Sequence, residues 1–137
     1  MKILILYGSE NDKPYLEPGR VYLEKHKIPY EEKVLSVHRN FDELIRYLGT
    51  LKKNSKIGAI LAVAGLSAAL PGIVAVKTEF PVIGVPVPAG PLNGIDALLS
   101  IIQVPGDVPV VSVGLHKKAP LNACIFAHRI LKLKGHP

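Results

Sequence analysis

The sequence contains no tryptophan and only one cysteine, and aromatic residues make up 6% of its 137 residues. The single cysteine, Cys124, cannot form an internal disulfide, which agrees with a reducing compartment. We expect it to be a small buried hydrophobe. With so few aromatic residues, the sequence shows no cluster of aromatic side chains on which nucleic-acid bases could stack. The net charge of +6 does not change this, because the basic residues are scattered, and a small phosphorylated ligand accounts for it equally well.

Long hydrophobic runs are missing as well. No segment approaches the roughly 18 consecutive apolar residues of a membrane span, and the first residues lack the cleavage region of a secretory signal. We therefore expect a cytoplasmic protein that does not contact a membrane. Because 48% of the residues are apolar, the chain has enough apolar side chains to form one buried core. A single domain over residues 1–137 is therefore expected.

Short apolar runs alternate with helical patterns along the chain. Five of these runs show no apolar–polar alternation, which is typical of parallel strands buried on both faces. Short connections and right-handed crossovers favour a three-layer, doubly wound α/β domain of flavodoxin-like type, with strand order 2-1-3-4-5. The expected strands are residues 2–7, 29–36, 57–64, 81–87 and 108–115, and the expected helices are residues 13–26 (distorted at Pro18–Gly19), 40–53, 66–78, 94–103 and 118–134.

This architecture predicts where a ligand binds. In open α/β sheets the ligand lies beyond the carboxyl ends of the strands, where the strand order reverses. In the order 2-1-3-4-5, the loops after strands one, two and three are neighbours at that point. These loops read GSEND (residues 8–12), SVHRN (residues 36–40) and AGLSAALPG (residues 64–72).

The first loop combines a glycine with three polar side chains. Gly8 permits a tight turn, and Ser9, Asn11 and Asp12 follow it near a helix N-terminus, which favours anions. An aspartate among donors suits ribose hydroxyls. The alternative is that Asp12 only caps the helix. The loop is not a GxGxxG dinucleotide fingerprint.

The second loop places an acid–base group beside an anion anchor. The guanidinium of Arg39 offers a fork of donors that matches phosphate or carboxylate, and Ser36 adds a hydroxyl. His38 is the residue type that titrates near neutrality, so it can act as both general acid and general base. The alternative is an exposed polar loop, but the position at the end of a strand favours function.

The remaining histidines rank below His38. His116 follows the fifth expected strand and is a second candidate at the ligand-bearing edge, whereas surface positions are expected for His26, His128 and His136. No pair of histidines, and no histidine with the cysteine, has the spacing of metal ligands, so no metal site is expected.

The third loop consists mostly of small residues. Such a loop lets backbone amides approach a ligand closely, and it can form a dry, apolar cover beside the cationic anchor. Dryness suits a decarboxylation–recarboxylation step, because desolvation favours neutral carbon dioxide. The alternative is simple packing of a helix on the sheet.

Five motifs, in order, resemble those of the PurE family of purine biosynthesis. GSEND resembles the family's GSxSD, and SVHRN resembles SAHR. AGLSAALPGIVAVKTEFPVIGVPV is similar to AGGAAHLPGxxAxxTxxPVIGVPV, and GIDALLSIIQVPGDVPVVSV to GxDSLLSIVQMPxGxPVATV. The last helix begins near the family's asparagine, at Asn122.

The resemblance implies an N5-carboxyaminoimidazole ribonucleotide mutase that forms an octamer and needs no metal or organic cofactor. Such an enzyme moves a carboxylate from the exocyclic nitrogen to ring carbon four, through bound carbon dioxide and aminoimidazole ribonucleotide. It is paired with an ATP-dependent synthase that makes the carboxyamino substrate. The residues implied are His38 for proton transfer, Gly8, Ser9, Asn11, Asp12, Ser36 and Arg39 for the nucleotide and its phosphate, and Ala64, Gly65, Leu66, Ala69 and Leu70 for the carboxylate and carbon dioxide.

The sequence also departs from the family motifs. Asn11 replaces a serine, Leu66 replaces a glycine and Ala69 replaces a histidine. The third loop, with its serine at Ser67, leans toward the family branch that carboxylates aminoimidazole ribonucleotide directly with free carbon dioxide, whereas His38–Arg39 keeps the pair typical of the mutase. A paralogue acting on another heteroaromatic nucleotide and an inactive nucleotide-binding module are further alternatives.

Overall fold

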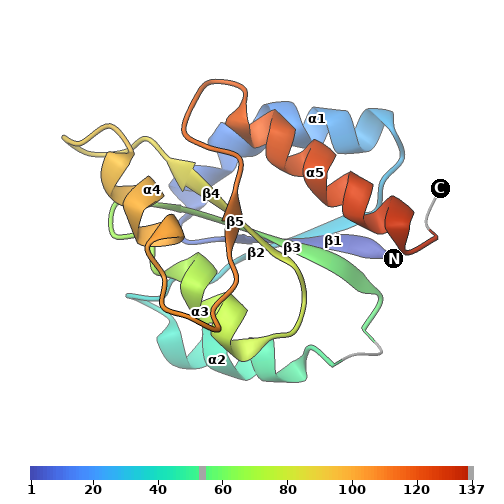
Figure 1. Cartoon of the computed structure of the whole chain (residues 1–137), viewed down its shortest axis with the longest axis horizontal. Helices are drawn as coiled ribbons and strands as arrows, with labels where there is room; N and C mark the ends of the chain where they lie inside the picture. The colour runs from blue at the N-terminus through green and yellow to red at the C-terminus, as the bar shows by residue number, and fades with distance from the viewer. Residues whose placement is uncertain (53–54, 136–137) are drawn as a thin grey trace.

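Five parallel strands form one sheet in the order β2-β1-β3-β4-β5, which confirms the predicted topology (Figure 1). The computed structural model describes residues 1–52 and 55–135. β1 lies between β2 and β3, so the strand order reverses beside it. The strands are β1 (Lys2–Tyr7), β2 (Tyr30–Val34), β3 (Ile57–Gly65), β4 (Val82–Val87) and β5 (Val111–Ser112).

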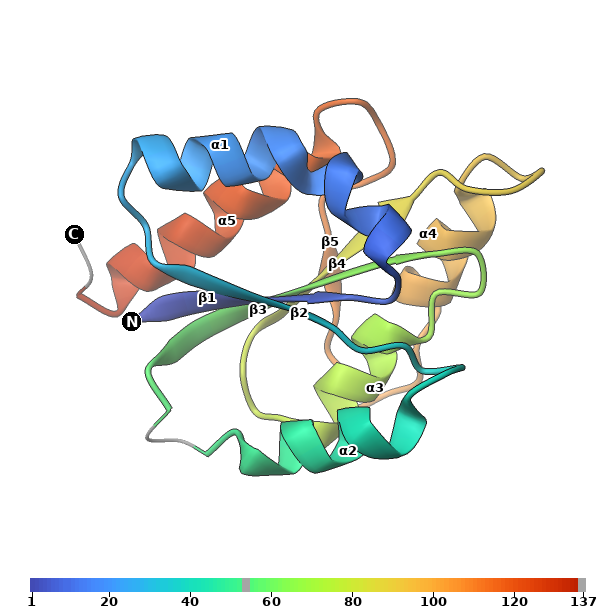
Figure 2. The ribbon, with the colours of Figure 1, turned by 180° about the vertical axis from the view of Figure 1, so that it is seen from behind.

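Helices cover both faces of the sheet and complete the three layers. α1 and α5 lie on one face, and α2, α3 and α4 lie on the other (Figures 1 and 2). Within residues 1–52 and 55–135, no helix is long and apolar enough to cross a membrane. The helices are the 3-10 helix η1 (Glu10–Leu16), α1 (Glu17–Lys25), α2 (Phe41–Thr50), α3 (Leu70–Lys77), α4 (Ile95–Ile102) and α5 (Ala119–Leu133).

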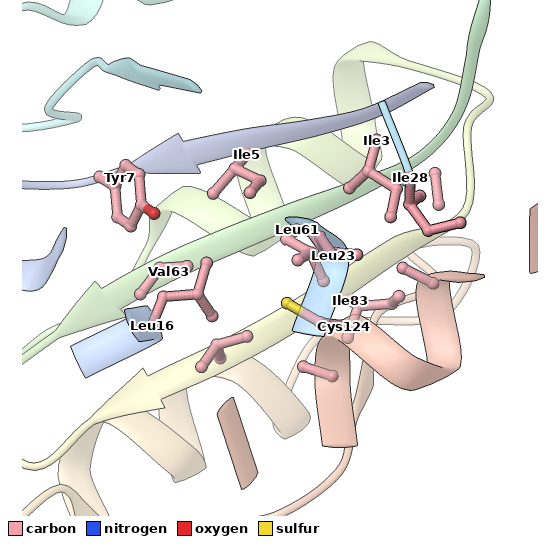
Figure 3. Close-up of a cluster of buried hydrophobic side chains, with 14 of the residues drawn as sticks. Ile3, Ile5, Tyr7, Leu16, Leu23, Ile28, Leu61, Val63, Ile83 and Cys124 are labelled. Atoms are coloured by element: carbon pink, nitrogen blue, oxygen red, sulfur yellow. The ribbon is translucent and has the colours of Figure 1, made fainter. Parts of the chain in front are cut away.

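The central strand β1 shows why the apolar runs do not alternate with polar residues. Every residue from Ile3 to Tyr7 is fully buried. Ile3, Ile5 and Tyr7 pack toward α1 and α5, while the leucines between them pack toward α2 and α3. Figure 3 shows the first cluster, in which Cys124 of α5 lies among the side chains of the sheet. Burial raises the pKa of the Cys124 thiol to about 12, so this residue behaves as the expected hydrophobe.

The first helical segment differs from the prediction of one distorted helix over residues 13–26. It consists of η1 and then α1, and the change falls between Leu16 and Glu17. Pro18 lies in the first turn of α1, where a missing backbone N–H costs nothing because that group has no partner within the helix. The predicted helix over residues 40–53 ends at Thr50, and residue 53 lies outside the described residues.

The last strand is much shorter than the predicted residues 108–115. β5 comprises only Val111 and Ser112, which pair with Ile83 and Gly84 of β4. Pro109 has no N–H to donate to a ladder, and Gly114 takes a left-handed φ of 98°. The apolar run therefore continues on both sides of β5 without forming a strand there.

The contact between α1 and α5 generates a test of this packing. A Cβ built on Gly19 would lie 2.4 Å from Sγ of Cys124 and 2.8 Å from the carbonyl oxygen of Pro120. We expect Gly19→Ala to lower the free energy of unfolding by roughly 1–3 kcal/mol, because the helices must move apart. Gly49→Ala is the matched control: it meets nothing within 4 Å on α2 and should raise that free energy by roughly 0.5 kcal/mol. Urea unfolding of both variants measures the difference, and equal effects would contradict the packing account.

Candidate active site

The carboxyl ends of β1, β2 and β3 meet at one edge of the sheet. Tyr7, at the end of β1, is in register with Val34 on β2 and with Val63 on β3. Backbone hydrogen bonds continue beyond this point, because the N–H of Gly8 donates to Val63 (2.9 Å) and the N–H of Leu35 donates to Tyr7 (2.9 Å). The loops that follow are thereby held side by side where the strand order reverses.

These loops enclose a pocket of about 470 Å³, within the range typical of small-molecule sites. Every residue that the family resemblance implies for the site lines it: Gly8, Ser9, Asn11, Asp12, Ser36, His38, Arg39, Ala64, Gly65, Leu66, Ala69 and Leu70. The structure thus brings all of them together, while the role of each stays a prediction.

The first loop holds a buried carboxylate. Ser9 is the N-cap of η1, because its Oγ accepts a hydrogen bond from the N–H of Asn11 (3.2 Å). The N-cap residue of this helix is therefore Ser9 and not Asp12. Asp12 is 8% exposed, and burial raises the pKa of its carboxyl, while a hydrogen bond with the backbone of Ser9 offsets part of this effect. A carboxylate at a poorly hydrated pocket wall is a strong acceptor for hydroxyl donors.

The second loop presents a cation and an imidazole to the same pocket. The Oγ of Ser36 accepts a hydrogen bond from the N–H of Arg39 (3.2 Å), which shapes the turn. The side chain of Arg39 is exposed, and no ion pair in the described part of the chain involves it. Nε2 of His38 lies 3.4 Å from the carbonyl oxygen of Ser67 in the third loop. Because a carbonyl oxygen only accepts, this contact is a hydrogen bond when Nε2 carries the hydrogen.

The third loop supplies an apolar wall. α3 begins at Leu70 instead of the predicted residue 66, so residues 66–69 belong to the loop. Ala64 and Ala68 are buried beneath it. Leu66 is 52% exposed and adopts a left-handed φ of 54°, which is rare for a leucine. The pocket therefore has charged groups on the side of the first two loops and apolar groups on the third.

Sequence reasoning left out part of the lining. Ala89 follows β4, and the rule that selected the first three loops also covers this one, because β4 runs parallel beside β3. The other omissions lie inside loops that were predicted. The four residues are Val37, Ser67, Ala68 and Ala89.

The second histidine candidate lies outside the pocket. His116 is exposed, does not line the pocket, and its Nδ1 accepts a hydrogen bond from the N–H of Lys118 (3.3 Å). His26 is exposed at the end of α1, as predicted. His136 lies outside the described residues.

The surface prediction for His128 is wrong. Its side chain is only 5% exposed, and its Nδ1 lies 2.9 Å from the hydroxyl of Tyr22 on α1. His128 follows Cys124 by one helical turn, and both lie on the face of α5 that packs against α1 and the sheet. The helical spacing from Cys124 was the signal that could have placed it correctly.

Comparisons with known proteins agree with the fold and the motifs. The family model for AIR carboxylase matches residues 2–136. The N5-carboxyaminoimidazole ribonucleotide mutase of Bacillus subtilis is 43% identical over 127 residues, which cover 93% of this chain and 78% of that protein. The phosphoribosylaminoimidazole carboxylase of Schizosaccharomyces pombe is 42% identical over 127 residues, 93% of this chain and 22% of that protein. The crystal structure of Treponema denticola PurE has a TM-score of 0.84 and 26% identity, and the match covers 96% of this chain and 80% of that one.

Burial of Asp12 generates a prediction about stability and pH. Its raised pKa means that the folded state disfavours the ionised carboxyl, so ionisation destabilises the fold above the folded-state pKa. We expect Asp12→Asn to raise the free energy of unfolding at pH 7. The gain should vanish as the pH falls below about 3.9, where the unfolded carboxyl is also protonated.

Urea unfolding between pH 3 and pH 7 measures this dependence. Asp107→Asn is the control, because Asp107 is exposed and its left-handed φ of 65° suits asparagine equally well. A loss of stability in Asp12→Asn at pH 7 would show that the folded state favours the ionised form.

Proposed function

The chain belongs to the AIR carboxylase family, and from this premise we propose that it converts N5-carboxyaminoimidazole ribonucleotide to 4-carboxy-5-aminoimidazole ribonucleotide in purine biosynthesis. One observation carries the proposal: an imidazole, an exposed guanidinium, a buried carboxylate and an apolar loop line a single pocket in a chain 43% identical to a mutase of this name.

The polar side of the pocket binds the nucleotide. Arg39 and the hydroxyl of Ser36 hold the phosphate, since the exposed guanidinium, which joins no ion pair within the described residues, can bind it through two donors. Asp12 accepts hydrogen bonds from the ribose hydroxyls, and Ser9 lies beside it in the same loop. These contacts place the imidazole ring of the substrate beside His38 and next to the third loop.

His38 handles one proton twice. In the first step the bond between the exocyclic nitrogen and the carboxylate carbon breaks, carbon dioxide leaves, and His38 gives a proton to that nitrogen. In the second step ring carbon four attacks the carbon dioxide and forms the new carbon–carbon bond. His38 then removes the hydrogen from carbon four, so the enzyme ends in the protonation state in which it began.

The third loop retains the carbon dioxide between these two steps. Its side chains from Ala64 to Leu70 offer no charged group, so water is poorly held and the neutral gas is not hydrated. Retention matters because an isomerisation requires the same carbon dioxide molecule to recombine.

A second candidate is direct carboxylation of aminoimidazole ribonucleotide by free carbon dioxide. It is favoured by the 42% identity to a phosphoribosylaminoimidazole carboxylase and by Leu66 and Ser67 in the third loop. Incubation with aminoimidazole ribonucleotide and bicarbonate, with and without the ATP-dependent synthase, separates the two. Product that forms only with the synthase supports the mutase and its pairing with that enzyme, whereas direct conversion supports the carboxylase.

The catalytic role of His38 is tested by His38→Asn on the carboxyamino substrate. We expect kcat to fall by roughly 10²–10⁴-fold, the usual contribution of general acid–base catalysis, while nucleotide binding is retained. His116→Asn is the matched comparison, because His116 does not line the pocket. Turnover by His38→Asn at the wild-type rate, or a comparable loss in His116→Asn, would contradict the assignment.

We also propose that the protein is a homo-octamer, the assembly that the family resemblance implies. Support comes from α4, where Ile95, Leu99 and Ile102 form one exposed apolar stripe. A stripe of this kind on a surface helix marks an interaction site.

Assembly is tested by native mass spectrometry. We expect Leu99→Glu to break the oligomer into smaller species while the fold is kept. Val76→Glu, at an exposed apolar position on α3, is the control and should remain assembled. A monomeric wild-type protein would contradict the proposal.

A further inference from the structure

Leu66 has a backbone conformation that its side chain does not favour. The described non-glycine residues with positive φ are Lys27, Leu66, Asn93 and Asp107. Asparagine and aspartate tolerate this region, and Lys27 directly follows the C-cap of α1, where left-handed residues are common. Neither reason applies to Leu66. Because its side chain is 52% exposed, burial in the core does not hold it there either. Such conformations persist where the surroundings impose them, and they cluster at active sites.

On one side, Leu66 is held by the loop after β4. A Cβ built on Gly90 would lie 2.7 Å from Cδ2 of Leu66, so the leucine side chain occupies the space that any larger residue at position 90 would need. The preceding residues are also close, because a Cβ on Gly65 would lie 3.3 Å from Cβ of Ala89. The end of β3 and the residue after it therefore contact the loop after β4 at two consecutive positions.

On the other side, the same turn meets His38. The carbonyl oxygen of Ser67 accepts a hydrogen bond from the N–H of Ala69 (2.9 Å) and faces Nε2 of His38 at 3.4 Å. The backbone of Leu66 sets the path of the chain into Ser67, and therefore where the Ser67 carbonyl lies relative to the imidazole. A return of Leu66 to negative φ would turn the carbonyl away from the imidazole.

We propose that Leu66 is a positioning residue for His38: its contact with Gly90 holds the left-handed turn that aims the Ser67 carbonyl at Nε2. The hydrogen of the neutral imidazole is thereby kept on Nε2, and Nδ1 is left as the nitrogen that gives and takes the proton. A hydrogen bond to one ring nitrogen sets the tautomer in this way. The inference rests on the proposed function for its catalytic consequence, but not for the tautomer itself.

The tautomer is measured directly by solid-state ¹⁵N NMR on protein labelled at histidine, with His38→Asn used to assign the signals. We expect neutral His38 of the wild type to carry its hydrogen on Nε2. In Leu66→Gly the signal should become a mixture of both tautomers, because glycine adopts φ 54° without strain yet lacks the contact with Gly90. Gly90→Ala provides a second route, since it keeps Leu66 but obstructs its side chain. A wild-type hydrogen on Nδ1, or an unchanged tautomer in both variants, would overturn the proposal.

The kinetic consequence is measured on the same variants. We expect Leu66→Gly to lower kcat about tenfold, because misplacement of a catalytic group slows the chemical step, and to leave KM unchanged, because the anchors of the nucleotide are on other loops. Leu66→Met should keep kcat near the wild-type value, since the methionine side chain can contact Gly90 as the leucine side chain does. Leu92→Gly, at an exposed leucine that does not line the pocket, is the matched control.

The outcomes separate positioning from simple packing and from failure of the proposed function. A fall in thermal stability of Leu66→Gly with kcat and tautomer intact would mean that Leu66 is only structural, and would overturn the proposal. If the wild type turns over neither purine intermediate, the proposed function fails. The NMR comparison of wild type, Leu66→Gly and Gly90→Ala then still decides whether Leu66 positions His38.

Discussion

The burial of β1 on both faces is the constraint on which the rest of the structure depends. Flanked by parallel β2 and β3 and covered by helices on both sides, β1 leaves no room for a polar side chain between Ile3 and Tyr7. Polar chemistry is thus confined to the residues after the strand ends. Because β2 ends in register with Tyr7 and β3 ends only two residues beyond its own partner of Tyr7, Val63, the loops of all three strands reach the same edge of the sheet. The pocket therefore lies where it does because the buried sheet admits polar side chains only beyond the ends of its strands.

The same constraint explains which parts of the fold were predictable. Strands buried on both faces appear in the sequence as apolar runs, so β1, β3 and β4 were predicted to within one residue. β5 pairs with only one neighbour, and the apolar run around it includes Pro109, which cannot donate to a ladder. Its length depends on hydrogen bonding that an apolar pattern does not report. The change from η1 to α1 is likewise a matter of local backbone geometry.

The location of the site was predictable from topology, but its detailed geometry was not. Loops after parallel strands converge wherever the order reverses, and this placed Asp12, His38 and Leu66 at one pocket without further information. The burial of His128 depends on how α5 packs against α1, and in the sequence only the spacing of one helical turn from Cys124 indicates it. We attribute the left-handed backbone of Leu66 to its contact with Gly90. In the sequence, only the glycine that the family motif has at this position indicates such a backbone.

Two residues of the pocket oppose the stability of the fold, and this separates it from another hollow on the molecule. Asp12 is a desolvated carboxylate and Leu66 is a strained leucine, yet they lie on separate loops that face the same 470 Å³. A larger hollow of about 960 Å³ at the amino ends of the strands is lined by the exposed lysines Lys52, Lys56, Lys77 and Lys134. None of its described lining residues is a buried titratable group or has a positive φ. Volume alone would favour that second hollow, but unfavourable conformations and buried charges persist where function requires them. Among the described lining residues of the two hollows, only those of the first pocket include a buried titratable group or a residue with positive φ.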